Sequence, residues 1–361
     1  MATQLSYGST RNKGAALTDP GRPRAVIAWL LACAFMVFAM AVIGAITRLT
    51  ESGLSIMEWA PLSGTLPPLS DAEWQRLFAL YKTIPQYQQI NAGMSLAEFK
   101  TIFWWEYIHR LWGRSIGLVF ALPLAWFWWR GRLPAWLKPH LLTLLGLGAL
   151  QGVMGWYMVA SGFADRVSVS QYRLTLHLGL AIFIYGYMLW LIFRLAWPDA
   201  GEESAEGPLH RLRRGLLGLL LLLSVTLVSG AFVAGLNAGL TYNSFPLMDG
   251  RLVPSGYGQL SPWILNSFEN IAAVQFNHRL LASLTLLATL GIYFWALRLP
   301  LTAAGQWALS LVALAAVGQF TLGVVTLLAV VPVSLGAAHQ AGALLLLTAV
   351  LHALYRLRPK A

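Results

Sequence analysis

The sequence predicts an all-α polytopic membrane protein, with eight transmembrane helices forming two tandem four-helix bundles. The first observation is composition: 57% of the 361 residues are hydrophobic and 11% are charged, which excludes an ordinary soluble protein. The second is that the apolar residues come in runs of about 20 or more, enough for a helix to cross a hydrocarbon core of about 30 Å. Runs of this length exclude an outer-membrane barrel, whose strands are about half as long. The third is an internal repeat, described below.

Eight apolar segments are expected to span the membrane. In chain order they are residues 25–46, 102–129, 141–160, 174–195, 216–236, 271–297, 307–331 and 333–355. The first span follows a polar, basic segment at residues 1–24 but has no small-residue cleavage site, so we expect a retained helix. Within the long outer loop, residues 47–101, Ser70 and Glu73 indicate the start of a short helix that covers the mouth of the bundle.

The distribution of positive charge predicts the orientation. The net charge is +11, and most Lys and Arg residues lie on the side of both termini, among them Arg11, Arg22, Arg130, Arg213 and Arg358. The positive-inside rule therefore predicts an N-in/C-in topology. The excess of Lys and Arg over Asp and Glu is explained by the orientation in the membrane, and no nucleic acid partner is expected. We expect a multi-pass protein of the bacterial cell inner (plasma) membrane, in preference to the mitochondrial inner membrane.

An internal repeat divides the chain into halves of four spans each. The matching pairs are Tyr107–Leu111 with Phe276–Leu280, Gln151 and Gly155 with Gln319 and Gly323, Leu176–Gly179 with Ala338–Ala341, and Gly44-Ala45 with Gly230-Ala231. Because four is an even number, both copies have the same orientation, and pseudo-twofold symmetry along the membrane normal is expected. The predicted organisation is a cytoplasmic N-terminal segment (1–24), an N-terminal half (25–198), a cytoplasmic linker (199–214), a C-terminal half (215–355) and a cytoplasmic tail (356–361).

Four of the seven histidines lie on the even-numbered spans near their outer ends: His109, His177, His278 and His339. A single histidine in a membrane helix is more often a packing residue, whereas four at one depth indicate ligands. Two imidazoles from facing helices can supply both axial ligands of a haem iron, and the repeat supplies such a pair twice. Zinc and copper fit less well, because each would need further N, S or carboxylate ligands. The single cysteine, Cys33, excludes an intrachain disulfide and an Fe–S cluster.

The two copies differ one helical turn before the first histidine, where Glu106 corresponds to Gln275. A carboxylate there can pair with Arg110 or Arg48, or it can take and deliver protons during oxidation of a bound substrate. The difference suggests that the first half reacts while the second holds a fixed electron carrier. Arg110 and Arg279 follow the histidines and are candidates for contacts with haem propionates, with snorkelling or helix pairing as the alternative.

These motifs resemble the haem A synthase family, and the resemblance covers essentially the whole chain. The segments that carry it are Gly44–Ser55, Trp105–Arg110, Tyr242–Gly250 and Asn277–Arg279. The resemblance implies an oxidoreductase that converts the C8 methyl of haem O, through a hydroxymethyl group, to the formyl group of haem A needed by terminal oxidases. It also implies haem b as cofactor, with His278 and His339 as axial ligands to its iron. His109 and His177 would then hold the substrate haem, with Glu106 as an essential acid.

The resemblance also implies partners and leaves alternatives. The partners are haem O, the lipid membrane, an unidentified electron acceptor, haem O synthase and terminal-oxidase assembly factors. One branch of the family has paired cysteines in its outer loops; this chain resembles the cysteine-free branch of proteobacteria and mitochondria. The main alternative is a bis-histidine di-haem cytochrome b linked to quinone, which explains the four histidines but not the difference between Glu106 and Gln275. A transporter is a second alternative, and it would require polar residues at mid-depth.

Overall fold

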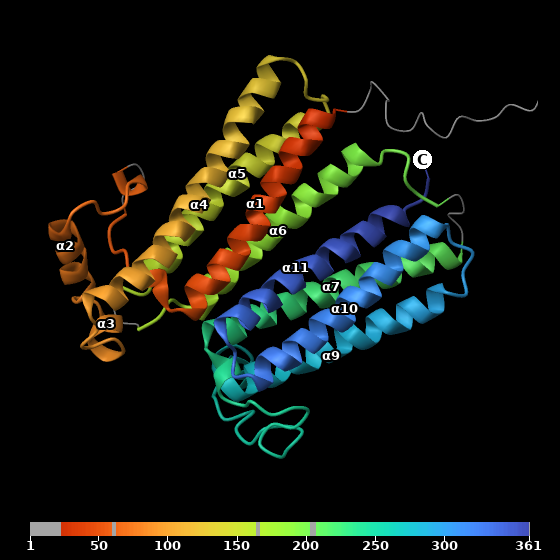
Figure 1. The fold of residues 1–361 in the computed structure, drawn as a ribbon. Helices are drawn as coiled ribbons and strands as arrows, with labels where there is room; N and C mark the ends of the chain where they lie inside the picture. The colour runs from red at the N-terminus through yellow and green to blue at the C-terminus, as the bar shows by residue number, and fades with distance from the viewer. Residues whose placement is uncertain (1–22, 60–62, 164–166, 203–206, 361) are drawn as a thin grey trace, which may run out of the picture.

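The computed structural model describes residues 23–59, 63–163, 167–202 and 207–360, and every regular element in these ranges is a helix. Eight of the described helices are long and apolar enough to cross a membrane, which confirms the predicted spans (Figure 1). They are α1 (Arg24–Leu49), α4 (Leu96–Trp129), α5 (Leu137–Ala160), α6 (Gln171–Ala196), α7 (Pro208–Gly235), α9 (Ile271–Ala296), α10 (Ala303–Leu328) and α11 (Val333–Arg356).

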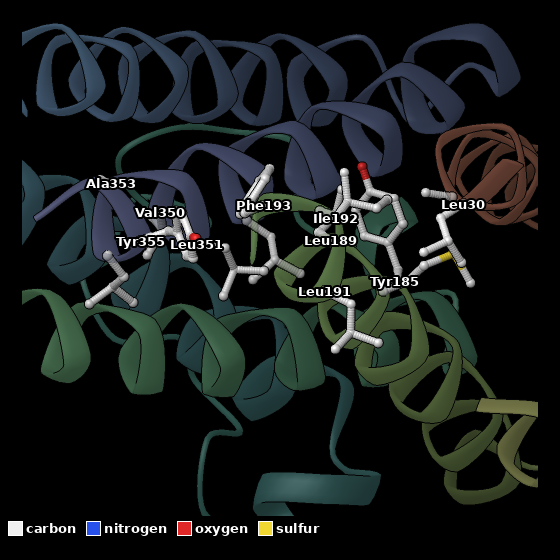
Figure 2. Close-up of a cluster of buried hydrophobic side chains, with 14 of the residues drawn as sticks. Leu30, Tyr185, Leu189, Leu191, Ile192, Phe193, Val350, Leu351, Ala353 and Tyr355 are labelled. Carbon is white, nitrogen blue, oxygen red and sulfur yellow. The ribbon is translucent and has the colours of Figure 1, made fainter. Parts of the chain in front are cut away.

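The eight long helices pack as two groups of four. Helices α1, α4, α5 and α6 contact one another, as do α7, α9, α10 and α11, and the groups meet where α1 and α6 lie against α7 and α11 (Figure 1). A continuous cluster of buried apolar side chains fills this junction, including Leu30, Leu216 and Val350, each fully buried. Figure 2 shows part of this cluster, with side chains of α1, α6 and α11 packed together. Close packing of this kind holds helices together in lipid, where the hydrophobic effect between them is weak.

Short helices fill the two long connections at one end of the molecule, called here the loop side (Figure 1). Between α1 and α4 lie η2 (Ser52–Leu54), η3 (Ser63–Thr65), α2 (Asp71–Tyr81) and α3 (Pro85–Gln89), and between α7 and α9 lie η4 (Ala238–Leu240), η5 (Trp263–Leu265) and α8 (Asn266–Glu269). Helix α2 begins where predicted, because the Ser70 side chain accepts a hydrogen bond from the Glu73 backbone. The aromatic side chains of α2, which are Trp74, Phe78 and Tyr81, are buried. They pack against Phe99 and Phe103 of α4.

Helix α4 begins earlier than the hydropathy predicts. Ser95 and Glu98 form a reciprocal capping box: the Ser95 hydroxyl accepts from the Glu98 backbone at 3.3 Å, and the Glu98 carboxylate accepts from the Ser95 backbone at 2.8 Å. His109 lies about 20 Å along the helix axis from Leu96 but about two turns from residue 102, where the predicted apolar span begins, so the prediction for its place in that span is unchanged. The first two turns of α4 pack on α2 and carry the helix beyond its apolar span.

The connection between the two halves is anchored to the start of α10 and to the end of the chain after α11. Helix α7 begins at Pro208, inside the segment predicted as the linker. Before it, the buried Glu202 carboxylate accepts hydrogen bonds from Thr302 N at 3.1 Å and Thr302 Oγ1 at 2.6 Å, at the start of α10. The Glu202 backbone pairs with Arg358 and Lys360 near the end of the chain. Residues 203–206 of the predicted linker and 1–22 of the predicted N-terminal segment lie outside the described residues.

Candidate functional site

Each of the four candidate histidines packs against a glycine of a neighbouring helix. The pairs are Gly44 (α1) with His109 (α4), Gly155 (α5) with His177 (α6), Gly230 (α7) with His278 (α9), and Gly323 (α10) with His339 (α11). A Cβ atom at any of these glycines would lie between 2.8 and 3.3 Å from the imidazole ring, closer than ordinary van der Waals contact. Glycine at these positions therefore makes the room in which each imidazole sits between helices.

The structure brings the histidines together in the predicted pairs. His109 and His177 are close enough to interact electrostatically, and so are His278 and His339. Each of the four residues is only partly covered by protein. Within the described residues, no group of three or more His, Cys, Asp or Glu is placed to bind a metal ion. Two imidazoles in a half are the donor set that a haem iron takes as axial ligands.

A glutamine supports the second histidine of each pair in the same way. The Nε2 atom of Gln151 lies 3.1 Å from Nδ1 of His177 and donates to the His177 carbonyl at 3.0 Å. In the other half, Nε2 of Gln319 lies 3.1 Å from Nδ1 of His339 and donates to its carbonyl at 2.9 Å. Both Oε1 atoms are buried, with no hydrogen-bond partner among the described residues. The glutamines that the repeat aligned thus hold equivalent rings.

Glu106 is buried on α4, with 2% of its surface exposed, and its carboxylate accepts four hydrogen bonds. Oε2 accepts from the Ser55 hydroxyl at 2.7 Å and from the Ile56 backbone at 2.8 Å. Oε1 accepts from Nε and Nη2 of Arg110 at 3.0 and 2.6 Å. Of the two arginines considered from sequence, Arg110 is therefore the ion-pair partner, whereas Arg48 bonds to Gly235 and Asn237 of the other half.

Arg110 and Arg279 bind loop backbone in matching positions. Each donates to the side chain four residues before it and to two carbonyls of the segment after the first helix of its half. The acceptors are Glu106, Ile56 and Glu58 for Arg110, and Gln275, Tyr242 and Ser244 for Arg279. The hydrogen bonds found for both guanidinium groups are thus with loop carbonyls and with the side chain four residues earlier on the same helix. Arg279 Nε has no hydrogen-bond partner in the described part of the chain.

The other three histidines do not join these pairs. His140 lies 2.6 Å through Nδ1 from the Tyr187 hydroxyl, and His352 packs against the rings of Phe193 and Trp197. His210 lies in the first turn of α7. Sequence reasoning missed Ser55 as a partner of Glu106, although it lies in the motif Gly44–Ser55.

Comparisons with known proteins show the family of the chain. The COX15-CtaA family model, described as cytochrome oxidase assembly protein, matches residues 27–351. The chain belongs to this family. Members similar to it include the haem A synthases of Nitrosomonas eutropha, 49% identical over 90% of this chain and 91% of the relative, and Rhodospirillum centenum, 51% identical over 93% and 89%. That of Granulibacter bethesdensis is 47% identical over 98% and 92%. These matches confirm the resemblance to the haem A synthase family that the sequence motifs indicated.

Proposed function

We propose that this multi-pass membrane protein is a haem A synthase, an oxidoreductase that converts haem O to haem A, and that it oxidises the C8 methyl group to a formyl group in its N-terminal half. Membership of the COX15-CtaA family and relatives named haem A synthase at about half identity support the overall activity. One observation supports the division of labour: two imidazole pairs lie in equivalent glycine-lined settings, and only the first has a buried carboxylate one turn away.

The two imidazole pairs are assigned different haems. His278 and His339 would hold a resident haem b, and His109 and His177 would hold the substrate haem O. Bound haem supplies the redox chemistry, and the chain supplies position and proton control. Gly230 and Gly323 keep the haem b ligands between helices, and Gly44 and Gly155 do the same for the substrate pair. The glycines thereby fix where each ring can approach an iron.

Glu106 is the proposed group that handles protons at the substrate. It lies three residues before His109 and therefore on the same face of α4, one turn nearer the loop side. The Arg110 guanidinium and the Ser55 hydroxyl both donate to its carboxylate and fix the position of the group that would exchange protons with the substrate. In the other half Gln275, which is neutral, donates instead to the carbonyl of Ala238. That half has no equivalent proton acceptor at this position.

The placement in the membrane follows from the same proposal. We infer an N-in/C-in topology with pseudo-twofold symmetry along the membrane normal, which puts the loop side outside and both haem sites nearer to it. The bacterial plasma membrane is the proposed location. The proposed source of haem O is the membrane or haem O synthase, and a haem b held by the second pair would supply the connection to an electron acceptor. Terminal-oxidase assembly factors are the proposed recipients of haem A.

Haem extraction from cells tests the proposed function. The chain is expressed in a bacterial host that makes haem O and lacks its own haem A synthase, and the extracted haems are separated by chromatography. Haem A is expected only when the chain is present, and haem O is expected to accumulate without it. A di-haem cytochrome b would leave haem O unchanged, so haem O alone in cells with well-expressed protein would contradict the proposal.

Gly323→Ala is expected to lower the haem b content of the purified protein by about tenfold, in line with the usual effect of disturbing the support of a ligand. The added Cβ would lie 2.8 Å from Cε1 of His339, so the ring must leave its position. Gly318→Ala on the same helix is the matched control, since nothing lies within 4 Å of a Cβ there. Haem content and the low-spin absorbance spectrum are measured for both, and equal haem loss from the two variants would count against the assignment of His339.

A further inference from the structure

The hydrogen bonding of the first histidine differs between the two halves, although each ring lies against a glycine of the neighbouring helix. Gly230 lies against His278 and Gly44 lies against His109, and the repeat aligns these glycines. The residue immediately before the glycine is Ser229 in the second half and Ile43 in the first. The second half therefore has a hydroxyl side chain at this position of the repeat, and the first half has a hydrocarbon side chain.

In the second half this hydroxyl determines which nitrogen of His278 carries the hydrogen. Ser229 Oγ lies 2.9 Å from Nδ1 of His278 and donates its only hydrogen to the carbonyl of Thr226 at 2.7 Å. The oxygen must then accept from Nδ1–H of the imidazole. This leaves Nε2 with a free lone pair, and it fixes the plane of the ring. His278 is thus prepared as a metal ligand before any metal binds.

In the first half the ring of His109 has no such support. No described residue forms a hydrogen bond with either nitrogen of His109. Its orientation also differs: a Cβ at Gly44 would meet Nε2 at 3.3 Å and then Cδ2 at 3.7 Å. At the other three glycines the nearest ring atom is Cε1, followed by Nδ1 and Nε2. The ring of His109 is therefore turned relative to the other three.

The remaining contacts do not account for this difference. Gln151 and Gln319 lie at nearly equal distances from Nδ1 and from the carbonyl of His177 and His339, and Gln151 Nε2 also lies 3.3 Å from Nε2 of His177. In both halves the first histidine lies against a glycine. The residue at position 43 or 229 is the contact that distinguishes the first ligand in one half from that in the other.

We propose that Ser229 makes His278 a fixed ligand of the resident haem, whereas Ile43 leaves His109 a weakly held ligand through which the substrate haem enters and the product leaves. The inference rests on the proposed function, and it adds a positioning residue for each half. A substrate site must release its haem in every cycle, while a cofactor site must not. Hydrogen bonding to the free nitrogen of a ligating histidine is a usual means of strengthening its bond to a metal.

Haem transfer to a scavenger protein tests this without relying on activity. Purified full-length protein is loaded with haem b and haem O, mixed with excess apomyoglobin, and followed by absorbance, with extraction identifying the haem lost in each phase. Wild type is expected to lose haem O in a fast phase and haem b in a slow one. Ile43→Ser is expected to slow the fast phase about ten- to hundredfold and leave the slow phase unchanged. Ser229→Ala is expected to accelerate the slow phase by a similar factor.

Matched controls separate support of the ligand from general effects. Val42→Ser adds the same hydroxyl to α1 about 100° around the helix from Ile43. Ser224→Ala removes a hydroxyl of α7 whose partner among the described residues is the Leu220 carbonyl. Both are expected to behave as wild type. An unchanged fast phase in Ile43→Ser, or an unchanged slow phase in Ser229→Ala, would overturn the inference and leave the proposed function standing. If wild type binds no haem O, the proposed function fails and the inference with it. If one variant does not fold, the other still decides.

Discussion

Glu106→Gln is expected to stop haem A formation while haem b stays bound. The change removes the charge that accepts a proton and keeps the size of the side chain. General acid–base groups usually contribute about a hundredfold to ten-thousandfold to a rate, and haem A production should fall by that order. The measurement is the ratio of haem A to haem O in extracts, together with the low-spin haem spectrum of the purified variant.

The second half of the chain indicates that the variant will fold. Gln275 occupies the equivalent position, and Arg279 donates to its Oε1 at 3.1 Å while holding the following loop. Glu98→Gln is the matched control on the same helix, because that carboxylate lies near the start of α4 and bonds only within the capping box. It should make haem A at the wild-type level. Normal haem A production by the Glu106 variant would remove Glu106 from the mechanism.

The fold was predictable from sequence where hydropathy alone determines it. All eight long helices were expected, because each needs an apolar run of fixed length to cross the membrane. The starts of α4 and α7 were not, since polar residues continue both helices beyond their apolar spans. For α4 a signal was present: Ser95 and Glu98 have the spacing of a capping box. The hydropathy criterion does not register such a cap.

Some features of the candidate site could also be predicted from the sequence, and others could not. The pairing of the histidines was predictable, because they recur at matched positions of the repeat. The role of Gly44 and Gly230 as contacts of the imidazoles was not, since a glycine in a membrane helix more often serves helix packing. The partner of Ser229 could not be predicted either: His278 is distant in sequence and comes near only when α7 packs on α9. Contacts between helices of this kind have no local pattern.

His278→Ala and His339→Ala are each expected to empty the haem b site. Both imidazoles would be needed to hold a haem iron in this half, and removing either takes away one of the two nitrogen donors. Bound haem b is expected to fall at least about tenfold. Disturbing only the hydrogen-bonded support of a ligand already lowers metal affinity by about tenfold, and removing the ligand should cost more. Haem content and the low-spin absorbance spectrum of the purified variants are the measurements.

Two other histidine variants serve as controls for this experiment. His352→Ala is the matched control, because His352 lies on α11 with His339 but packs against Phe193 and Trp197. It should retain haem b. His109→Ala should also retain haem b and lose the substrate haem, since its partner is His177 in the other half. An unchanged low-spin spectrum in His278→Ala or His339→Ala would contradict the assignment. Loss of haem b from all four variants would mean that the halves do not bind haem independently, and the division between a reacting half and a fixed carrier would then be wrong.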